Sequence, residues 1–394
     1  MNLPSDFSQR THELLGDNDY RQLEDALQDE APVSIRVNSA KCDREVKGER
    51  VPWSANGIYL AERPTFTFDP LFHAGCYYVQ EASSMFVEQV LKTYVSSPVV
   101  MLDLCAAPGG KSTHVRGILP ENSLLVANEV IRNRSQILAE NLTKWGHPDV
   151  VVTNSDPSDF TPLEEFFDVI LTDVPCSGEG MFRKDPVAVS EWSSENVEIC
   201  RQRQRRIISD IWPCLKPGGL LIYSTCTYNT KENEENVRWI KDEFGAEVLP
   251  LDVAEDWNIT GNLLQGERFP VYRFLPHKTK GEGFFLAVLR KPGASVRKPG
   301  AEQAFALGKA SETPAVRGEN PRGKGRKPQG KGMKTPGLSK EQLSVLAEWL
   351  LAPDIYEFIQ KGGSVSAFPK RYLSELSALQ SSVRIVQAGL EIAG

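Results

Sequence analysis

Short apolar runs alternate with helical stretches through the middle of the chain, and this alternation restricts the fold more than any other feature. Runs such as 99–104 (VVMLDL) and 167–172 (FDVILT) are almost continuously apolar, which is typical of strands covered on both faces. Strands that alternate with helices form a parallel sheet with crossover helices. Strands are predicted at residues 99–104, 124–128, 150–153, 167–172, 219–224, 247–251 and 283–289, and helices from about 112 to Pro120 and at 132–145, 194–215 and 232–244. Residues 96–292 are therefore predicted to form an α/β domain.

The rest of the chain divides into three regions by composition. Residues 1–95 mix helical and extended signals, with leucines at helical spacing within 8–30 and an alternating strand pattern at 33–37. Residues 293–337 are rich in Gly, Pro, Lys and Arg, which is typical of a flexible linker. Apolar periodicity returns in residues 338–394, where a small C-terminal module is predicted.

Charge is unevenly distributed along the chain. The net charge is −7, yet residues 293–337 hold ten Lys or Arg against three Glu. A polyanion responds to such a local basic stretch rather than to the average charge. The stretch is therefore either a contact for nucleic acid or a solvated linker.

Several classes of protein are excluded by what the sequence lacks. Its apolar runs are far shorter than the ~18 residues of a spanning helix, and its N-terminus has no apolar stretch of a secretory signal. The seven cysteines include no CxxC pair, which argues against a disulfide framework and for reduced thiols. The five histidines are scattered, without the spacing of metal ligands. We expect a cytoplasmic protein without a membrane contact or a metal.

A loop of small residues follows the first predicted strand and indicates a ligand site. Residues 105–111 (CAAPGGK) would let a ligand approach the backbone at the start of a helix. The loop matches neither the dinucleotide pattern GxGxxG nor the phosphate-binding pattern GxxxxGK[ST]. Glu129 lies at the end of the second strand, 19 positions beyond Gly110. Acidic residues in this place bind ribose hydroxyls, so an adenosine-containing ligand is predicted.

Two cysteines follow two other strand ends. Cys176 lies in residues 173–178 (DVPCSG), and Cys226 lies in residues 224–226 (STC). A buried cysteine is commonly an inert apolar side chain, whereas a thiolate with a lowered pKa is a good nucleophile. The predicted helix after Cys226 would lower the pKa of its thiol. By spacing alone, a nucleophile and a structural thiol are both consistent with these positions.

Three segments together resemble the motifs of the Sun-family RNA (cytosine-5) methyltransferases. They are LDLCAAPGGKS (102–112), DVPCSGEGMFRKDP (173–186) and YSTCTYNTKENEENV (223–237). Three further segments resemble other parts of the same family: VSIRVNSAK (33–41), HAGCYYVQEASSM (73–85) and RFLPHKTKGEGFFLAVLRK (273–291). AFPKRY (367–372) resembles the C-terminal domain of the bacterial ribosomal-RNA branch. The resemblance implies a Rossmann-like methyltransferase sheet with an antiparallel last strand, an N-terminal RNA-binding region and S-adenosyl-L-methionine as cofactor.

The resemblance also implies roles for individual residues. The nucleophile would be Cys226, Cys176 would assist product release, and Asp173 would lie beside both the cofactor and the target base. The cofactor would be held by Cys105, Ala106, Ala107, Pro108, Gly109, Gly110, Lys111, Glu129, Arg134, Asp156 and Asp173. Val174 replaces the usual alanine, and the chain stops soon after residues 383–393, so the C-terminal module is expected to be incomplete.

The implied reaction explains why these residue types are needed. Carbon 5 of cytosine is too weak a nucleophile to accept a methyl group directly. Attack of the Cys226 thiolate on carbon 6 would make carbon 5 electron-rich, and Asp173 would stabilise the adduct. The base must leave its stack, which favours single-stranded or loop RNA.

The RNA-binding surface is predicted from basic and aromatic side chains. Candidates for phosphate contacts are Arg36, Arg183, Lys184, Arg201, Arg203, Arg205, Arg206 and the linker. Phe182 and Tyr228 could stack on the base or pack in the interior.

The predicted function is cytosine-5 methylation of ribosomal RNA by a monomeric enzyme, and four other functions compete with it. Methylation of transfer RNA is the nearest, and only the C-terminal module favours ribosomal RNA. A non-catalytic ribosome-assembly factor would share the scaffold and the RNA binding. An amino-nitrogen methyltransferase would have [DN]PP[YF] where this chain has DVPC (173–176), and a DNA cytosine-5 enzyme would carry its nucleophile in the PC pair.

Overall fold

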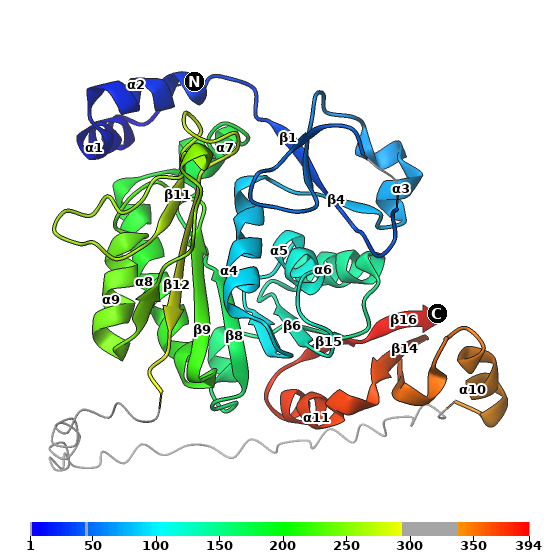
Figure 1. Cartoon of the computed structure of the whole chain (residues 1–394). Coiled ribbons are helices and arrows are strands. Elements are labelled where there is room, and N and C mark those ends of the chain that lie inside the picture. Colours follow the sequence, from blue (N-terminus) through cyan, green and yellow to red (C-terminus); the bar gives the residue numbers. More distant parts are fainter. Residues whose placement is uncertain (1, 44–45, 294–337, 394) are drawn as a thin grey trace, which may run out of the picture.

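A nine-stranded sheet lies at the centre of the protein (Figure 1). The computed structural model describes residues 2–43, 46–293 and 338–393, so the predicted linker lies outside the described residues except for Gly293. The strand order is β10-β12-β9-β8-β5-β6-β7-β15, with β11 beside β12. These strands are β5 Val100–Asp103, β6 Leu124–Asn128, β7 Val150–Thr153, β8 Phe167–Asp173, β9 Leu215–Thr225, β10 Glu247–Leu249, β11 Tyr272–Phe274, β12 Phe284–Arg290 and β15 Ile385–Ala388.

The sheet confirms the predicted α/β fold. Strands β7, β6, β5, β8 and β9 are parallel, and β12 is antiparallel to β9, as the family resemblance implies. Neighbouring residues of β5 face opposite cores, Met101 in one and Leu102 in the other, which accounts for the apolar runs. The helices of this domain are α4 Val87–Tyr94, α5 Gly110–Arg116, α6 Arg132–Trp145, α7 Pro186–Glu191, α8 Ser194–Ile211 and α9 Glu234–Phe244.

Two predicted boundaries differ from the structure by four residues each. Helix α8 ends at Ile211 rather than at 215, because Pro213 has no N–H to continue the helical hydrogen bonds. Strand β9 begins at Leu215, since Leu215 pairs with Phe167 of β8. The other main-sheet elements agree with prediction to within a few residues.

The N-terminal region lies over the end of the sheet where the parallel strands finish (Figure 1). The predicted helix within 8–30 is in fact two helices separated by Gly16, whose φ of 78° no helix accommodates. Strand β1 agrees with the prediction for 33–37 and lies inside an antiparallel sheet of order β2-β3-β1-β4. The elements are α1 Ser5–Leu15, α2 Asp17–Ala26, β1 Val33–Val37, β2 Glu49–Arg50, β3 Gly57–Leu60, α3 Pro70–His73 and β4 Tyr77–Val79.

A buried polar cluster joins this region to the central domain. His114 of α5 contacts Glu88 of α4, with 3.0 Å between Nε2 and Oε2. Gln80 lies 3.4 Å from His114 Nδ1 and accepts a hydrogen bond from Arg36 Nε at 2.8 Å. Burial lowers the pKa of His114 to about 4, so the imidazole is neutral at pH 7.

Acid should destabilise the protein through this histidine. Below about pH 6.5 the unfolded chain protonates His114 while the folded protein does not, so the free energy of unfolding falls as the pH drops towards 4. Between pH 7 and pH 5 the loss is on the order of 2 kcal/mol. Urea unfolding of wild type and His114→Gln at both pH values measures it, because glutamine does not titrate. An equal loss in both proteins would contradict the assignment.

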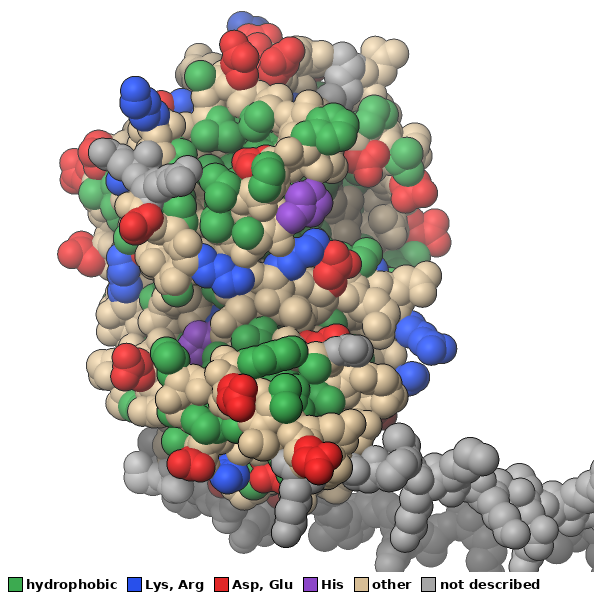
Figure 2. Space-filling view, turned by 90° about the vertical axis from the view of Figure 1, so that its right-hand side faces the viewer, with side chains coloured by type: hydrophobic (Ala, Val, Ile, Leu, Met, Phe, Trp, Pro, Cys, Tyr) green, Lys and Arg blue, Asp and Glu red, His purple; other side chains and the backbone are tan. Residues whose placement is uncertain are grey.

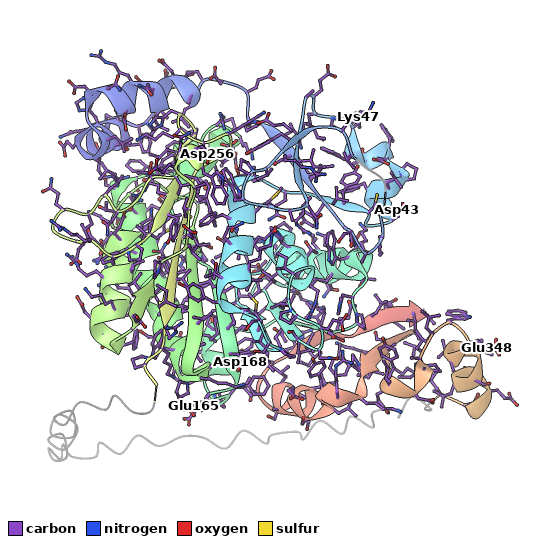
Figure 3. The ribbon with its side chains drawn as sticks, in the orientation of Figure 1. Asp43, Lys47, Glu165, Asp168, Asp256 and Glu348 are labelled. Carbon is purple, nitrogen blue, oxygen red and sulfur yellow. The ribbon has the colours of Figure 1, made fainter. Side chains whose placement is uncertain are left out.

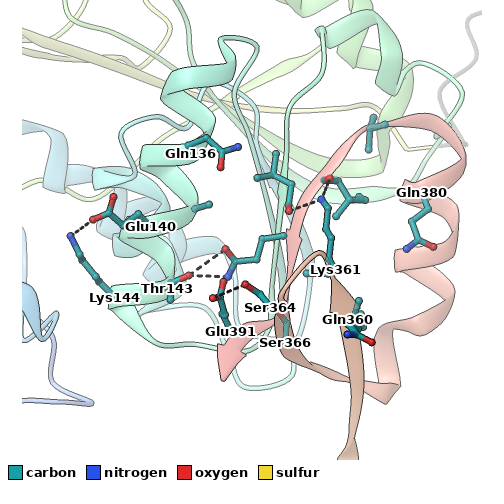
Figure 4. A pocket seen from close by; sticks show the side chains of 17 residues that line it. Gln136, Glu140, Thr143, Lys144, Gln360, Lys361, Ser364, Ser366, Gln380 and Glu391 are labelled. Carbon is teal, nitrogen blue, oxygen red and sulfur yellow. Dashed lines mark hydrogen bonds and ion pairs between the residues drawn. The ribbon is translucent and has the colours of Figure 1, made fainter. Parts of the chain in front are cut away.

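The predicted C-terminal module contributes a strand to the central sheet. Strand β15 pairs antiparallel with β7, and β13, β14 and β16 form a separate sheet. Lys361 Nζ donates hydrogen bonds to the carbonyls of Ile385 and Val386. The module consists of α10 Lys340–Ala347, β13 Tyr356–Lys361, β14 Ser364–Pro369, α11 Leu373–Ser382, β15 Ile385–Ala388 and β16 Leu390–Ala393. A cleft of about 870 Å³ separates this module from α6 (Figure 4).

At the end of the sheet where the parallel strands begin, the carboxylate of Asp168 connects three neighbouring strands. Asp168 lies near the start of β8, at the lower end of the sheet beside Glu165 (Figure 3). Its carboxylate accepts hydrogen bonds from Val100 N at 2.8 Å and from Lys216 Nζ at 2.7 Å.

Among the described residues, no helix is long and apolar enough to cross a membrane.

Candidate active site

The loop of residues 105–111, Asp173 and Cys226 lie at the carboxyl ends of β5, β8 and β9. The chain runs outward from β5 to β7 and then returns to the other side of β5 with β8. Open α/β sheets bind ligands at such a switch point. The strand register places Asp103 beside Leu171 and Asp173 beside Ser224, so β8 ends two residues beyond β5 and β9 one residue beyond β8.

Asp173 is fixed from two sides. Lys111 Nζ donates to Asp173 Oδ2 at 2.8 Å, and Ser224 Oγ donates to Asp173 Oδ1 at 2.8 Å. Burial alone would lower the pKa of Lys111, but the adjacent Asp173 carboxylate raises it above its usual value. Lys111 therefore stays charged and holds the carboxylate in one orientation, with a third of the Asp173 side chain still exposed.

The loop of residues 105–110 is held by its backbone. Two side chains of α6 donate hydrogen bonds to its carbonyls. Arg134 Nη2 donates to the carbonyl of Ala107 at 2.8 Å, and Asn141 Nδ2 donates to that of Pro108 at 2.7 Å. Gly109 has a φ of 114°, and α5 begins at the next residue instead of at 112 as predicted. The side chains of the loop are small, and burial raises the pKa of the Cys105 thiol, which is therefore neutral.

Glu129 is buried, and Arg134 connects it to the same loop. Its Oε1 accepts a hydrogen bond from Ile131 N at 2.9 Å, and its Oε2 lies 3.4 Å from Arg134 Nη1. At the end of β5, Asp103 Oδ2 accepts from Ser112 Oγ at 2.6 Å, while Oδ1 is buried with no hydrogen-bond partner among the described residues. Burial raises the pKa of Asp103 to about 7.

Asp156 has a different environment from the other predicted cofactor residues. Its carboxylate accepts a hydrogen bond from Ser158 N at 3.1 Å and caps a short 3₁₀ turn, Pro157–Phe160. Arg206 of α8 forms an ion pair with it, with 3.6 Å between Arg206 Nη2 and Asp156 Oδ2. The predicted contact of Asp156 with an adenine stays a prediction.

The two predicted cysteines face each other. The Sγ atoms of Cys176 and Cys226 are 3.1 Å apart, and Cys226 N donates to Cys176 Sγ at 3.4 Å. The hydrogen bond to the Cys226 thiol and then burial raise the pKa of Cys176 well above its usual value, so Cys176 is a thiol at neutral pH. The predicted helix after Cys226 is α9, which begins at Glu234, two residues later than predicted.

Two buried carboxylates near the cysteines have roles that the sequence does not reveal. Glu179 accepts hydrogen bonds from Tyr228 N at 2.7 Å and Asn229 N at 3.0 Å. Glu232 accepts from Ser177 N at 3.0 Å. Burial raises the pKa of Glu232 to about 6. Both residues lie inside the motif segments, but nothing in the spacing indicates that they join one cysteine segment to the other.

Several side chains proposed for RNA contacts are internal. Arg36 is buried and donates to Gln80 and Thr113, and Arg183 is 6% exposed and pairs with Glu282 at 3.1 Å. Neither is available to a phosphate, so these two predictions are wrong.

The aromatic candidates are internal too. Phe182 and Tyr228 pack in a core cluster with Phe7, so the packing alternative holds for both.

The remaining basic candidates lie nearer the surface. Arg203 and Arg206 are exposed on α8, and Lys184 is exposed before α7. Arg201 and Arg205 are partly buried, the former paired with Glu198 and the latter with Asn236. Lys and Arg side chains lie among Asp and Glu side chains on the face in Figure 2, so its described part carries both signs of charge.

In the part of the chain that the structure describes, no three His, Cys, Asp or Glu side chains gather as a metal site.

Comparison with protein families identifies two matching segments. Residues 94–290 match the family model "16S rRNA methyltransferase RsmB/F". Residues 3–82 match the model "N-terminal domain of 16S rRNA methyltransferase RsmF".

Curated proteins with the name "Ribosomal RNA small subunit methyltransferase F" are similar to the chain. The protein of Pectobacterium atrosepticum is 36% identical over 276 residues, which cover 66% of this chain and 57% of the relative. An Escherichia coli protein is 36% identical over 250 residues, which cover 62% of this chain and 52% of the relative. The chain thus spans little more than half the length of these relatives.

Solved structures agree with the fold. A methyltransferase homologue from Pyrococcus horikoshii has a TM-score of 0.62 and 29% identity, over 72% of this chain and 94% of the other. The crystal structure of NSun6 from Pyrococcus horikoshii with SFG has a TM-score of 0.63 at 22% identity, over 73% and 98% of the two chains. The second likeness concerns the fold alone.

Proposed function

Because the chain belongs to the 16S rRNA methyltransferase RsmB/F family, we propose that it transfers a methyl group to carbon 5 of a cytosine in ribosomal RNA. The methyl donor would be S-adenosyl-L-methionine. The observation that carries the proposal is the pair of thiols 3.1 Å apart, at the edge of the sheet where Lys111 and Ser224 fix Asp173. A nucleophilic thiol is what carbon-5 chemistry on cytosine requires. Action as a monomer in the cytoplasm remains a prediction.

The residues at the strand ends fit this cofactor. Glu129 has a carboxylate oxygen with only a distant partner, which suits a ribose hydroxyl. Asp103 Oδ1, which is buried and has no hydrogen-bond partner in the described part of the chain, offers a further acceptor near the loop. Residues 105–111 would hold the methionine part, Glu129 with Arg134 the ribose end, and Asp156 the adenine. When bound, S-adenosylmethionine supplies the methyl group.

The chain's own residues would then act in sequence. The Cys226 thiolate would add to carbon 6 of the cytosine, and the electron pair would move to carbon 5. Asp173, oriented by Lys111, would accept a hydrogen bond from the amino group of the base and share a proton with ring nitrogen 3, which takes up the negative charge of the adduct. Once carbon 5 carries the methyl group, its proton would pass to a base, and the electron pair of that C–H bond would expel the Cys226 thiolate from carbon 6 and restore the aromatic ring. Cys176 would assist this last step.

Transfer of label from tritiated S-adenosylmethionine tests the proposed function. The acceptors are naked ribosomal RNA, assembled small subunits and transfer RNA, all from cells that lack the protein. Label in 5-methylcytosine of ribosomal RNA is expected. Label in transfer RNA alone would identify a different substrate, and no label despite cofactor binding would favour an assembly factor.

Replacement of Cys176 should separate attack from release. We expect Cys176→Ala to accumulate a covalent complex of protein and RNA and to lose most of its turnover, because Cys226 still attacks but leaves slowly. Denaturing electrophoresis with labelled RNA detects the complex as a band of low mobility. A variant with lost turnover and no such band would contradict the assigned role.

A further inference from the structure

Glu232 lies buried between the two cysteine segments, and its carboxylate is saturated with hydrogen bonds. Oε2 accepts from Ser177 N at 3.0 Å and Gln204 Nε2 at 2.8 Å. Oε1 accepts from Ser177 Oγ at 2.5 Å and Asn229 Nδ2 at 2.8 Å. Four donors on one carboxylate leave it little freedom to move.

These donors hold Cys176 from both sides in the sequence. Ser177 follows Cys176 directly and gives Glu232 both its backbone N–H and its hydroxyl. Pro175 precedes Cys176, and its carbonyl accepts a hydrogen bond from the same Gln204 amide at 3.0 Å. The backbone on each side of Cys176 is therefore tied, directly or through Gln204, to one carboxylate.

The same carboxylate reaches the segment of the second cysteine. Asn229 Nδ2 donates to Glu232 and, at 2.9 Å, to the hydroxyl of Thr227, which follows Cys226. The Ser177 and Thr227 hydroxyls are 3.0 Å apart. The 3.1 Å approach of the two sulfurs is thus built by a network with Glu232 at its centre.

We propose that Glu232 is a positioning residue that holds the Cys176 thiol against Cys226, so that Cys226 attacks the base and Cys176 acts in its release. This inference rests on the proposed function. Glu232 touches neither sulfur through a hydrogen bond, and it acts through Ser177, Gln204 and Asn229.

Glu232→Gln tests the role, because glutamine keeps the volume and replaces one acceptor oxygen with a donor. That amide would face donors that are already present, so the Cys176 segment, which Ser177 ties directly to Glu232, should shift more than the Cys226 segment, which is tied only through Asn229. We expect the ratio of covalent RNA adduct to methylated product to rise between roughly tenfold and 100-fold over wild type. Cys176→Ala is the reference for a high ratio.

Glu234→Gln is the matched control. Glu234 is equally buried but pairs with Arg273, at 2.6 and 2.7 Å, instead of with the cysteine segments. The Glu234→Gln substitution should lower the stability of the protein and its total activity, while the ratio of covalent adduct to methylated product stays at the wild-type value. Should Glu232→Gln fail to fold, Ser177→Ala removes the hydroxyl contacts with Glu232 and Thr227 but keeps the backbone hydrogen bond, and it should raise the ratio in the same direction by a smaller factor.

The outcomes separate the inference from the proposed function. A folded Glu232→Gln or Ser177→Ala protein with the wild-type ratio would overturn the positioning role, because a merely structural residue lowers adduct and product together. A wild-type protein that makes no 5-methylcytosine in any RNA would overturn the proposed function and the inference with it.

Discussion

Replacement of Cys226 by alanine is expected to lower the rate of methyl transfer by at least ~10³-fold, with the affinity for S-adenosylmethionine unchanged. Without the thiolate, carbon 5 of the cytosine stays a poor nucleophile, and correct positioning of the methyl donor cannot compensate. Tritium incorporation into ribosomal RNA measures the rate, and calorimetric titration measures cofactor affinity. The covalent adduct should be absent from this variant and from the double variant with Cys176→Ala.

A second cysteine provides the control for this loss. Cys42 is a free, partly exposed thiol in the N-terminal region, outside the segments 102–112, 173–186 and 223–237. Cys42→Ala should methylate RNA at the wild-type rate. If Cys226→Ala also retained activity, the thiol would not be the nucleophile. If it lost cofactor binding, the residue would support the site instead of attacking the base.

Local signals explain why much of the fold could be predicted. Residues 124–128, 132–145 and 150–153 form a strand, a helix and a strand with the predicted bounds. Both strands are buried on both faces, and the helix ends where Gly146 adopts a φ of 87°. The early start of β9 could not be predicted, because Pro217, Gly218 and Gly219 suggest a loop and only the distant partner strand decides otherwise.

The predictable part of the site has the same origin. Glu129 and Cys226 each follow a strand and Asp173 ends one, and parallel strands bring such positions to one edge. The network around Glu232 could not be predicted, since its partners Ser177 and Gln204 are 55 and 28 positions away. A carboxylate in a polar segment resembles any solvated side chain until the fold buries it.

Basic side chains show the converse error. Charge alone suggested that Arg36 and Arg183 face RNA, yet both are paired inside the protein. Burial of an arginine requires an acceptor from elsewhere in the chain, and the acceptors Gln80 and Glu282 are distant in sequence. Strand β15 is a similar case, because its place beside β7 depends on tertiary pairing.

Asp173→Asn is expected to lower the rate of methyl transfer by roughly 10²- to 10⁴-fold, the usual contribution of a positioned acid–base or charge-stabilising group. Asparagine keeps the shape but removes the charge that Lys111 orients, and its amide cannot accept on both sides as the carboxylate does. Single-turnover methylation with saturating cofactor isolates the chemical step. The yield of covalent adduct should fall with the rate, because stabilisation of the adduct is the role in question.

The other end of the same strand supplies the matched control for Asp173. Asp168 is also bound by a lysine and one further donor, but at the start of β8 (Figure 3). Asp168→Asn should lower the free energy of unfolding modestly and leave the single-turnover rate at the wild-type value. Equal losses of rate in the two variants would mean that the strand needs its carboxylates for folding. A loss confined to Asp173→Asn would locate the chemistry at the carboxyl edge, because the two residues differ in position along β8 and hardly in the kind of contact they make.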